Sequence, residues 1–329
     1  MSIAERFDAA FAPLAAAVAA GRIPGGVLGV VDASGNRVVR AIGRALIVPT
    51  SRPMTEATWF DLASLTKVLF TTPRILALAA EGRIDLDAPL VSVLPDFRQY
   101  NPDNWERKVT FRQCLGHQTP FPAVFPIYTY GRDPDLLRAF VLQHEWVAGP
   151  AVYSDINFIL LGLALERLER RSIRAMDPGA GFAWSAPADQ AAATEDDTWR
   201  LRVLSGEVHD DNASALQGAG HAGLFGTAAS LVDFAAARLS DTGPDALIRT
   251  PLSARRTHGW ERPYEGWSGG ERCSPQTIGH TGFTGTGLWI DFARGHAWTL
   301  LTNRIHPTRH FDSGIVALRR ATGDLINAD

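Results

Sequence analysis

The pattern of apolar positions predicts a helix at each end of the chain. Phe7, Phe11 and Leu14 recur at helical spacing among alanines, which is typical of an amphipathic helix with one buried face. This first helix is expected to end at Gly21. A second helix, over residues 311–326, is expected to close the chain.

Four short segments are rich in β-branched and aromatic residues. They are expected to form strands at residues 27–32, 37–42, 288–291 and 297–302. Ser34-Gly35-Asn36 lies between the first two segments and is typical of a hairpin turn. Because two segments lie near each terminus, the sequence predicts one antiparallel sheet built from both ends of the chain.

Helical periodicity dominates the middle of the chain, where the helices are joined by long polar connections. The clearest helical segments are residues 68–81, 136–144, 156–170 and 230–240. Pro73 lies inside the first of them and is expected to kink that helix, because proline removes a backbone donor. The same helix is expected to stop at Gly82.

These elements together indicate an α+β fold, in which helices flank an antiparallel sheet and an all-helical domain is inserted. We expect residues 1–75 and 250–329 to form the sheet domain, and residues 76–249 to form the helical domain. A length of 329 residues suits one large or two interleaved domains. A functional site is expected in the cleft where the two parts meet.

Composition and charge exclude several classes of function. With 46% hydrophobic and 20% charged residues and a formal charge of −3, the chain offers no electrostatic surface for nucleic acid or an anionic membrane. No apolar run approaches the roughly 18 residues of a membrane span. Glu5, Arg6 and Asp8 leave no positive segment ahead of the alanines, so we expect a cytoplasmic protein without a signal peptide. Cys114 and Cys273 predict neither a disulfide framework nor a metal site.

The first candidate for chemistry is a serine three residues before a lysine. Only Lys67 and Lys108 among the 32 basic residues are lysines, and a desolvated lysine can lose its proton whereas arginine cannot. If Ser64 begins a helix, Lys67 lies one turn further along the same face. The helix N-terminus then favours an alkoxide on Ser64 and disfavours the ammonium of Lys67. Taken alone, the pair is better explained by a helix-capping serine and a solvated lysine.

Two further motifs follow in the chain. Tyr153-Ser154-Asp155 directly precedes the helix expected from residue 156, and a phenol can share a proton with a lysine because both have a pKa of about 10. Gly279-His280-Thr281-Gly282-Phe283 contains glycines that permit close backbone approach to a ligand, and the Phe283 amide can face an oxyanion. Each motif alone also fits a structural role, as a half-buried tyrosine at a helix start and as a glycine-rich strand turn.

Together the three motifs resemble, in order and approximate spacing, the S-x-x-K, Y-x-N and K-T-G motifs of the serine β-lactamase and penicillin-binding protein superfamily. Residues 78–90, 109–122 and 218–229 also resemble recurring segments of these proteins, so the resemblance covers most of the chain. It implies a β-lactamase/transpeptidase-like fold. The tyrosine is similar to that of class C β-lactamases and related esterases.

The resemblance implies an acyl-enzyme mechanism. Ser64 would attack a carbonyl, with Lys67 and Tyr153 as a coupled proton relay. The backbone amides of Ser64 and Phe283 would form the oxyanion hole, and water would release the acyl group. The substrate would be a small-molecule ester, amide or β-lactam, and neither a cofactor nor a metal ion is expected.

Two departures from the superfamily's motifs bear on the substrate. His280 replaces the K-T-G lysine, and a neutral histidine supplies no fixed cation for the carboxylate of a penicillin or a D-alanyl-D-alanine stem. Asp155 replaces the Y-x-N asparagine, and a carboxylate cannot donate to a substrate carbonyl and would repel an acid. Together with Thr281 and Gly282, these residues are the expected substrate contacts.

We therefore expect a carboxylesterase-type hydrolase acting on small neutral esters or amides. The alternative is β-lactamase, D-alanyl-D-alanine carboxypeptidase or D-aminopeptidase-like activity, which an arginine from elsewhere in the chain could support by replacing the missing cation. A non-catalytic penicillin-recognising binding protein is a lesser alternative, because both the serine and its lysine are retained.

Two weaker signals leave structural and functional interpretations open. Residues 208–212 place a single histidine beside two carboxylates, which is a poor zinc signature and favours a polar loop near the cleft. Four tryptophans either line an apolar acyl pocket or pack in the core: Trp199, Trp260, Trp267 and Trp289.

Overall fold

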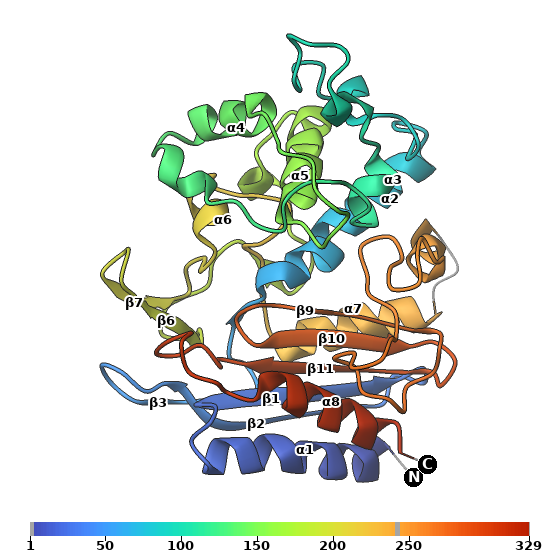
Figure 1. Ribbon diagram of the computed structural model, residues 1–329. Helices are drawn as coiled ribbons and strands as arrows, with labels where there is room; N and C mark the ends of the chain where they lie inside the picture. The colour runs from blue at the N-terminus through green and yellow to red at the C-terminus, as the bar shows by residue number, and fades with distance from the viewer. Residues whose placement is uncertain (1–2, 241–243, 329) are drawn as a thin grey trace.

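The computed structural model describes residues 3–240 and 244–328, and its centre is a six-stranded antiparallel sheet (Figure 1). The strands are β1 (Gly25–Asp32), β2 (Arg37–Leu46), β3 (Arg52–Pro53), β9 (Thr277–Thr281), β10 (Thr286–Asp291) and β11 (His296–Thr302). Their order is β3-β2-β1-β11-β10-β9. Strand β1 pairs with β11, with Gly26 opposite Thr302 and Asp32 opposite His296. The sheet is thus built from both ends of the chain, as the sequence predicted.

Helices cover both faces of this sheet (Figure 1). On one face α1 (Ile3–Ala19) packs against α8 (Ile315–Ile326), and on the other face α7 (Ala228–Ser240) packs against β1 and β11. Side chains of β1 alternate between the two resulting cores, with Leu28 on the α1 side and Val27 on the α7 side. Because both faces are covered, nearly every residue of β1 is buried.

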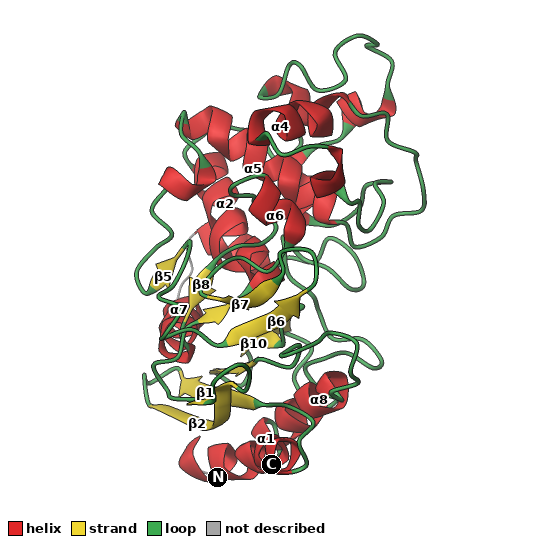
Figure 2. Ribbon diagram, turned by 90° about the vertical axis from the view of Figure 1, so that its left-hand side faces the viewer, coloured by secondary structure: helices red, strands yellow, loops and turns green. Residues whose placement is uncertain are grey.

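The middle of the chain forms a helical region above the sheet in the view of Figure 2. Its helices are α2 (Thr72–Ala80), α3 (Phe111–Leu115), α4 (Pro134–Gln143), α5 (Asp155–Glu169) and α6 (Asp211–Ala215). Helix α5 is buried along most of its length, from Ile156 to Leu165, so it forms the centre of this region. A helix that is apolar on all sides is expected in such a position.

Two smaller sheets lie between the helical region and the large sheet. One contains β4 (Phe60–Asp61), β8 (Phe225–Gly226) and β5 (Phe182–Ala183), and the other contains β6 (Ala193–Asp197) and β7 (Arg202–Ser205). Strand β4 directly precedes Ser64. The small sheet around β8 therefore anchors the segment that carries the first motif.

Pro73 does not kink a continuous helix, which corrects the expectation for residues 68–81. The chain instead forms a 3₁₀ turn at Ala63–Leu65, a π turn at Lys67–Thr71 and then α2, with Pro73 in its first turn. Proline is tolerated there because the first amides of an α-helix need no internal acceptor.

The residue boundaries between the sheet domain and the inserted helical domain stay a prediction. Helix α7 belongs to the stretch 76–249 in sequence but packs on the large sheet. Within the described part of the chain, no helix is long and apolar enough to cross a membrane.

Candidate active site

Ser64 lies in a tight turn that follows a residue with left-handed backbone geometry. Ala63 has φ 46°, a conformation that costs a non-glycine residue about 1–3 kcal/mol. The turn is held in place because the Ala63 amide donates to Asp61 Oδ1 at 2.8 Å and the Leu62 amide donates to the Leu224 carbonyl at 2.9 Å. One local contact and one contact from a distant segment thus fix the serine just after β4.

Lys67 is fully buried, and three acceptors surround its ammonium group. Nζ donates to Ser64 Oγ at 2.9 Å and to the His221 carbonyl at 3.1 Å, and it forms an ion pair with Asp155 Oδ1 at 2.8 Å. The carboxylate of Asp155 compensates the ammonium charge, although this contact does not have hydrogen-bond geometry. The site therefore holds the lysine in the charged form.

The pKa of Lys67 moves in the opposite direction to the one expected from its place near a helix start. Burial lowers the pKa, but the charges of Asp155 and Tyr153 together outweigh burial and raise it above its usual range. A continuous α-helix does not begin at Ser64, so no full helix dipole acts on the lysine. The neighbouring carboxylate thus decides the charge of Lys67.

Tyr153 lies against the same group, with its hydroxyl within hydrogen-bonding reach of Lys67 and Ser64. Burial raises the pKa of Tyr153, while the positive charge of Lys67 opposes that rise. The ring of His117 stacks on the phenol ring, with centroids 4.4 Å apart. His117 Nδ1 also accepts a hydrogen bond from the Ser154 amide at 3.1 Å, which fixes the start of α5 beside the tyrosine.

Asp155 is the first residue of α5. It was expected to contact the substrate, and the structure also places it close enough to Lys67 to form an ion pair. Its amide donates to the Ala123 carbonyl at 3.0 Å, and its side chain lines the pocket beside Ser64 while pairing with Lys67. The two charges compensate each other. Asp155 consequently presents much less repulsion to an acid than a free carboxylate would.

The third motif begins inside β9, and the turn that follows the strand packs directly onto the Ser64 turn. Thr284 Oγ1 donates to the Asp61 carbonyl at 2.7 Å, and Thr286 Oγ1 donates to the Leu62 carbonyl at 3.1 Å. A Cβ at Gly282 would lie 2.5 Å from the Leu62 carbonyl oxygen, so only glycine permits this approach. These contacts hold the serine turn in a fixed position against the large sheet.

Two backbone amides remain free to bind a ligand at this junction. Neither the Ser64 amide nor the Phe283 amide has a hydrogen-bond partner among the residues that the structure describes. The Phe283 carbonyl accepts from Arg304 Nε at 2.9 Å, which fixes the orientation of its peptide. Paired free amides beside a nucleophile are the usual composition of an oxyanion hole.

His280 is buried and neutral. Burial, followed by the charges of Lys67 and Arg256, holds its pKa well below the usual range. Its Nδ1 lies 3.0 Å from the carbonyl of Thr281, the last residue of β9, so Nδ1–H is the donor. The ring centroid lies 5.9 Å from that of Tyr153. His280 thus lies beside Tyr153 without adding a charge.

An arginine does lie near the position that the missing K-T-G lysine would occupy. The Arg256 guanidinium carbon is 5.2 Å from the centroid of the Tyr153 ring. Its Nη2 forms an ion pair with Glu261 at 3.1 Å, so its charge is partly compensated. Sequence reasoning left this possibility open but could not identify the residue.

A pocket of about 350 Å³ opens in front of these groups, and we call it the inner pocket. It is lined by Ala63, Ser64, Val124, Phe125, Pro126, Tyr128, Asp155, His209, Asp210, Asp211, Asn212, Ala222, Phe283 and Arg309. Arg309 reaches Glu195 Oε2 at 2.6 Å, and His209 Nε2 lies 2.9 Å from the same oxygen. Charged groups in the inner pocket are therefore largely paired with each other.

Residues 208–212 contribute to this wall as a polar loop. Asp210 Oδ1 pairs with His221 Nε2 at 2.9 Å and accepts from the Ala213 amide at 2.7 Å, so it supports the segment that binds Lys67. Among the described residues, no cluster of histidine, cysteine and carboxylate side chains could hold a metal ion.

None of the four tryptophans lines the inner pocket. Trp260, Trp267 and Trp289 are fully buried in the hydrophobic cores, because their large rings fill space between the sheet and its covering elements. Trp199 is different, since 68% of it is exposed and it lies in the turn between β6 and β7.

Sequence reasoning missed the residues that support the three motifs. His117, His221 and Asp210 lie in or near the segments that resemble the superfamily, but no role was assigned to them. A buried histidine is common in protein cores, so its partner can be recognised only once the fold brings the motifs together.

Comparison with known proteins agrees with this architecture. A family profile described as Beta-lactamase matches residues 7–322. "N-acetylmuramyl-L-alanine amidase" of Bacillus subtilis (strain 168) is 28% identical over 306 residues, covering 77% of this chain and 69% of the relative. "Putative D-alanyl-D-alanine carboxypeptidase" of Salmonella agona (strain SL483) is 28% identical over 307 residues, covering 77% and 71%. A class C beta lactamase structure superposes with a TM-score of 0.74, at 18% identity and 98% coverage of both chains.

The chain belongs to the Beta-lactamase family, since the profile spans nearly all of it. The predicted β-lactamase/transpeptidase-like fold is confirmed by the structural match. The protein is therefore a serine hydrolase of this family, whose particular activity is a separate question.

Proposed function

We propose that the protein is a carboxylesterase-type hydrolase that forms an acyl-enzyme on Ser64 and acts on neutral esters or amides. The observation that carries this proposal is the grouping of Ser64, Lys67, Tyr153 and two free amides at one end of the inner pocket. A nucleophile, a proton relay and an oxyanion hole are the parts that acyl transfer requires.

The reaction begins when Ser64 Oγ attacks the substrate carbonyl carbon. The base form of the coupled Lys67–Tyr153 pair takes the hydroxyl proton, and the Ser64 and Phe283 amides bind the oxyanion. The same pair then protonates the leaving group as its bond to the carbonyl carbon breaks. A water molecule then attacks the acyl carbonyl carbon and gives a proton to the same pair. The bond to Ser64 Oγ breaks, the pair returns a proton to the serine, and the acid is released.

The charges around Ser64 favour a substrate that is neutral near the bond to be cleaved. Lys67 pairs with Asp155, Arg309 pairs with Glu195, and His280 is uncharged. A substrate carboxylate placed beside the reacting carbonyl would lose its water without gaining an unpaired cation. This argument supports a neutral ester or amide over a penicillin.

The second candidate is a peptidase or amidase acting on cell-wall peptides. The printed names of two relatives favour it, because one is an amidase and the other a putative carboxypeptidase. The position of Arg256 near Tyr153 also favours it, since a partly compensated cation there could attract a terminal carboxylate.

The decisive experiment compares wild type and Ser64→Ala on two substrates, p-nitrophenyl butyrate and a D-alanyl-D-alanine peptide. We expect wild type to hydrolyse the ester, and Ser64→Ala to lose about 10⁴-fold or more of kcat. Rates within tenfold of wild type in Ser64→Ala would exclude Ser64 as the nucleophile. Hydrolysis of the peptide alone would establish the second candidate instead.

A further inference from the structure

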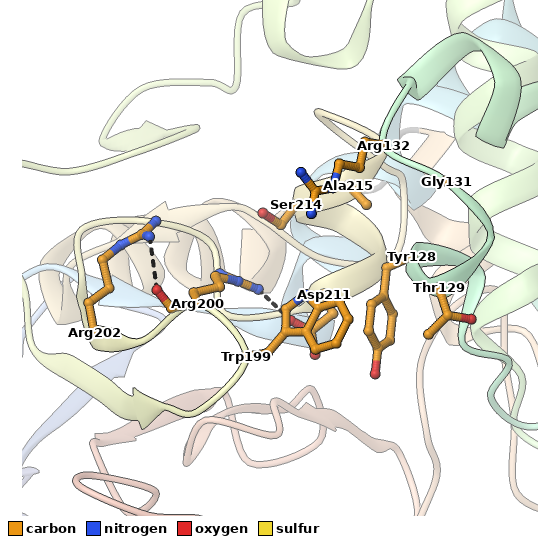
Figure 3. Close-up of a pocket in the computed structure, with 10 residues that line it drawn as sticks. All are labelled: Tyr128, Thr129, Gly131, Arg132, Trp199, Arg200, Arg202, Asp211, Ser214 and Ala215. Carbon is orange, nitrogen blue, oxygen red and sulfur yellow. Dashed lines mark hydrogen bonds and ion pairs between the residues drawn. The ribbon is translucent and has the colours of Figure 1, made fainter.

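A second pocket adjoins the inner pocket and differs from it in charge. This outer pocket of about 950 Å³ is lined by Tyr128, Thr129, Gly131, Arg132, Trp199, Arg200, Arg202, Asp211, Ser214 and Ala215 (Figure 3). Tyr128 and Asp211 line both pockets, so the two spaces lie next to each other. A substrate that is bound at Ser64 can therefore extend into the outer pocket.

Two aromatic rings form a wall of the outer pocket. Trp199 and Tyr128 have centroids 5.8 Å apart at an interplanar angle of 76°, and Figure 3 shows the two rings next to each other. They come from different parts of the chain, since Trp199 lies between β6 and β7 and Tyr128 in the 3₁₀ turn before α4. With 68% of its surface exposed, Trp199 offers an apolar face that the protein itself leaves uncovered.

The three arginines of the outer pocket differ in whether their charge is compensated. Arg200 pairs with Asp211 at 2.7 Å, and Arg202 pairs with Glu207 at 2.6 Å. Arg132 lies next to Ser214 and Ala215 in Figure 3 and has neither an ion pair nor a hydrogen bond with any residue that the structure describes. The outer pocket thus combines an apolar wall with one available cation.

We propose that the outer pocket is a subsite for the distal end of the substrate, and that it takes an apolar chain ending in a carboxylate. This inference rests on the proposed acyl-transfer function, because it assigns the part of the substrate remote from the cleaved bond. The chain packs on Trp199 and Tyr128, and its carboxylate accepts hydrogen bonds from Arg132. The substrate is then neutral at the reacting carbonyl and anionic at its far end.

The test uses p-nitrophenyl monoesters of succinic, adipic and suberic acid, each compared with the ester in which the free carboxyl is a primary amide. The amide has nearly the same shape without the charge. In wild type, kcat/KM for the acid should exceed that for the amide in the longer members of the series. The preference should be carried by KM, because binding at a remote subsite does not alter the chemical step.

Three variants separate the contributions of charge and ring. Arg132→Gln should reduce the preference for the acid by about tenfold, and Arg132→Lys should retain most of it. Trp199→Ala should raise KM for the longer acid and amide alike. The matched control is Arg202→Gln, which removes an arginine of the same pocket that is already paired with Glu207. An unchanged preference in Arg132→Gln at every chain length would overturn the proposal.

The small ester p-nitrophenyl butyrate separates the subsite from the proposed function. Arg132→Gln and Trp199→Ala should lower kcat/KM for butyrate far less than for the suberic acid monoester, since the butyryl group is too short to use a remote subsite. If wild type hydrolyses none of the esters, calorimetric titration with suberic acid monoamide still tests the subsite. Weaker binding to Arg132→Gln by about tenfold supports it, and equal binding overturns it.

Discussion

The inner and outer pockets share two lining residues. They differ because the outer pocket contains an arginine that has no carboxylate partner among the described residues. In the inner pocket Lys67 is fully buried and pairs with Asp155, and Arg309 pairs with Glu195. In the outer pocket Arg132 is exposed and has no partner among the described residues. A buried charge without a partner is costly, whereas an exposed one keeps its water. The paired charges at the inner pocket are therefore held in place, whereas Arg132 of the outer pocket is available to a charged ligand.

The largest expected effect comes from exchanging lysine for arginine at Lys67, compared with the reverse exchange at Arg132 in the outer pocket. Lys67→Arg should lower kcat by about 10³-fold or more, because arginine keeps the charge but cannot accept a proton. Arg132→Lys should leave kcat on p-nitrophenyl butyrate unchanged. Steady-state kinetics on that ester measures both variants. A Lys67→Arg enzyme of near wild-type activity would show that Lys67 is structural.

A cation added to the inner pocket should change substrate choice. His280→Lys should raise the rate of acylation by a penicillin by about tenfold, because a charge there can bind the substrate carboxylate. Stopped-flow measurement of acyl-enzyme formation reads this directly. Arg132→Gln serves as the comparison and should leave penicillin acylation unchanged. An unaltered rate in His280→Lys would mean that Asp155 or the pocket shape sets the barrier.

Removal of the inner carboxylate should shift the pH dependence of activity. Asp155 raises the pKa of Lys67, so the base form of the relay is populated only as pH rises. In Asp155→Asn the pKa of Lys67 falls, and the acidic limb of kcat/KM moves to lower pH, with activity at about pH 6 roughly threefold or more above wild type. Asp211→Asn is the matched control, since Asp211 pairs with Arg200 instead. Coincident pH profiles for wild type and Asp155→Asn would refute this role.

The smallest expected effect concerns stability at acid pH. Burial opposes ionisation of Glu195, but His209 and Arg309 outweigh it and lower its pKa from 4.5 to about 2. The unfolded chain binds this proton more readily, so the ionised Glu195 stabilises the fold above about pH 4.5 and loses its effect as pH falls toward 2. In thermal unfolding, Glu195→Gln should have a Tm below that of wild type at neutral pH, and the gap should narrow on acidification. A gap that is constant with pH would contradict this assignment.

The sequence predicted the large elements well because their signals are local. The expected strand at residues 297–302 and the expected helix at 156–170 match β11 and α5 closely, since a short run of aromatic and β-branched residues and a long apolar segment are both local signals. Pro73 was interpreted wrongly, as a kink in one helix. Whether proline lies inside a helix or in its first turn depends on where that helix begins, and here a π turn precedes it.

For the candidate site, the sequence predicted the three motifs and their order along the chain, but not the contacts between distant segments. Ser64 and Lys67 are close in sequence, so their contact at 2.9 Å follows from local geometry. Asp155 was expected to face the substrate, but it pairs with Lys67 from a different helix. No local pattern reports such a pairing. The same holds for Arg256, which approaches Tyr153 from a loop about a hundred residues away in the chain.

The sequence by itself determined the family, the antiparallel sheet made from both termini, and the three motifs in which we expect a nucleophile, a proton relay and an oxyanion-binding turn. Only the tertiary structure decided the charge of the site. The charge state of Lys67 depends on which groups lie within a few ångströms of Nζ, and those groups come from segments far apart in the chain. The outer pocket has the same origin, because Trp199 and Arg132 line one pocket only when the β6–β7 turn packs beside the helical region.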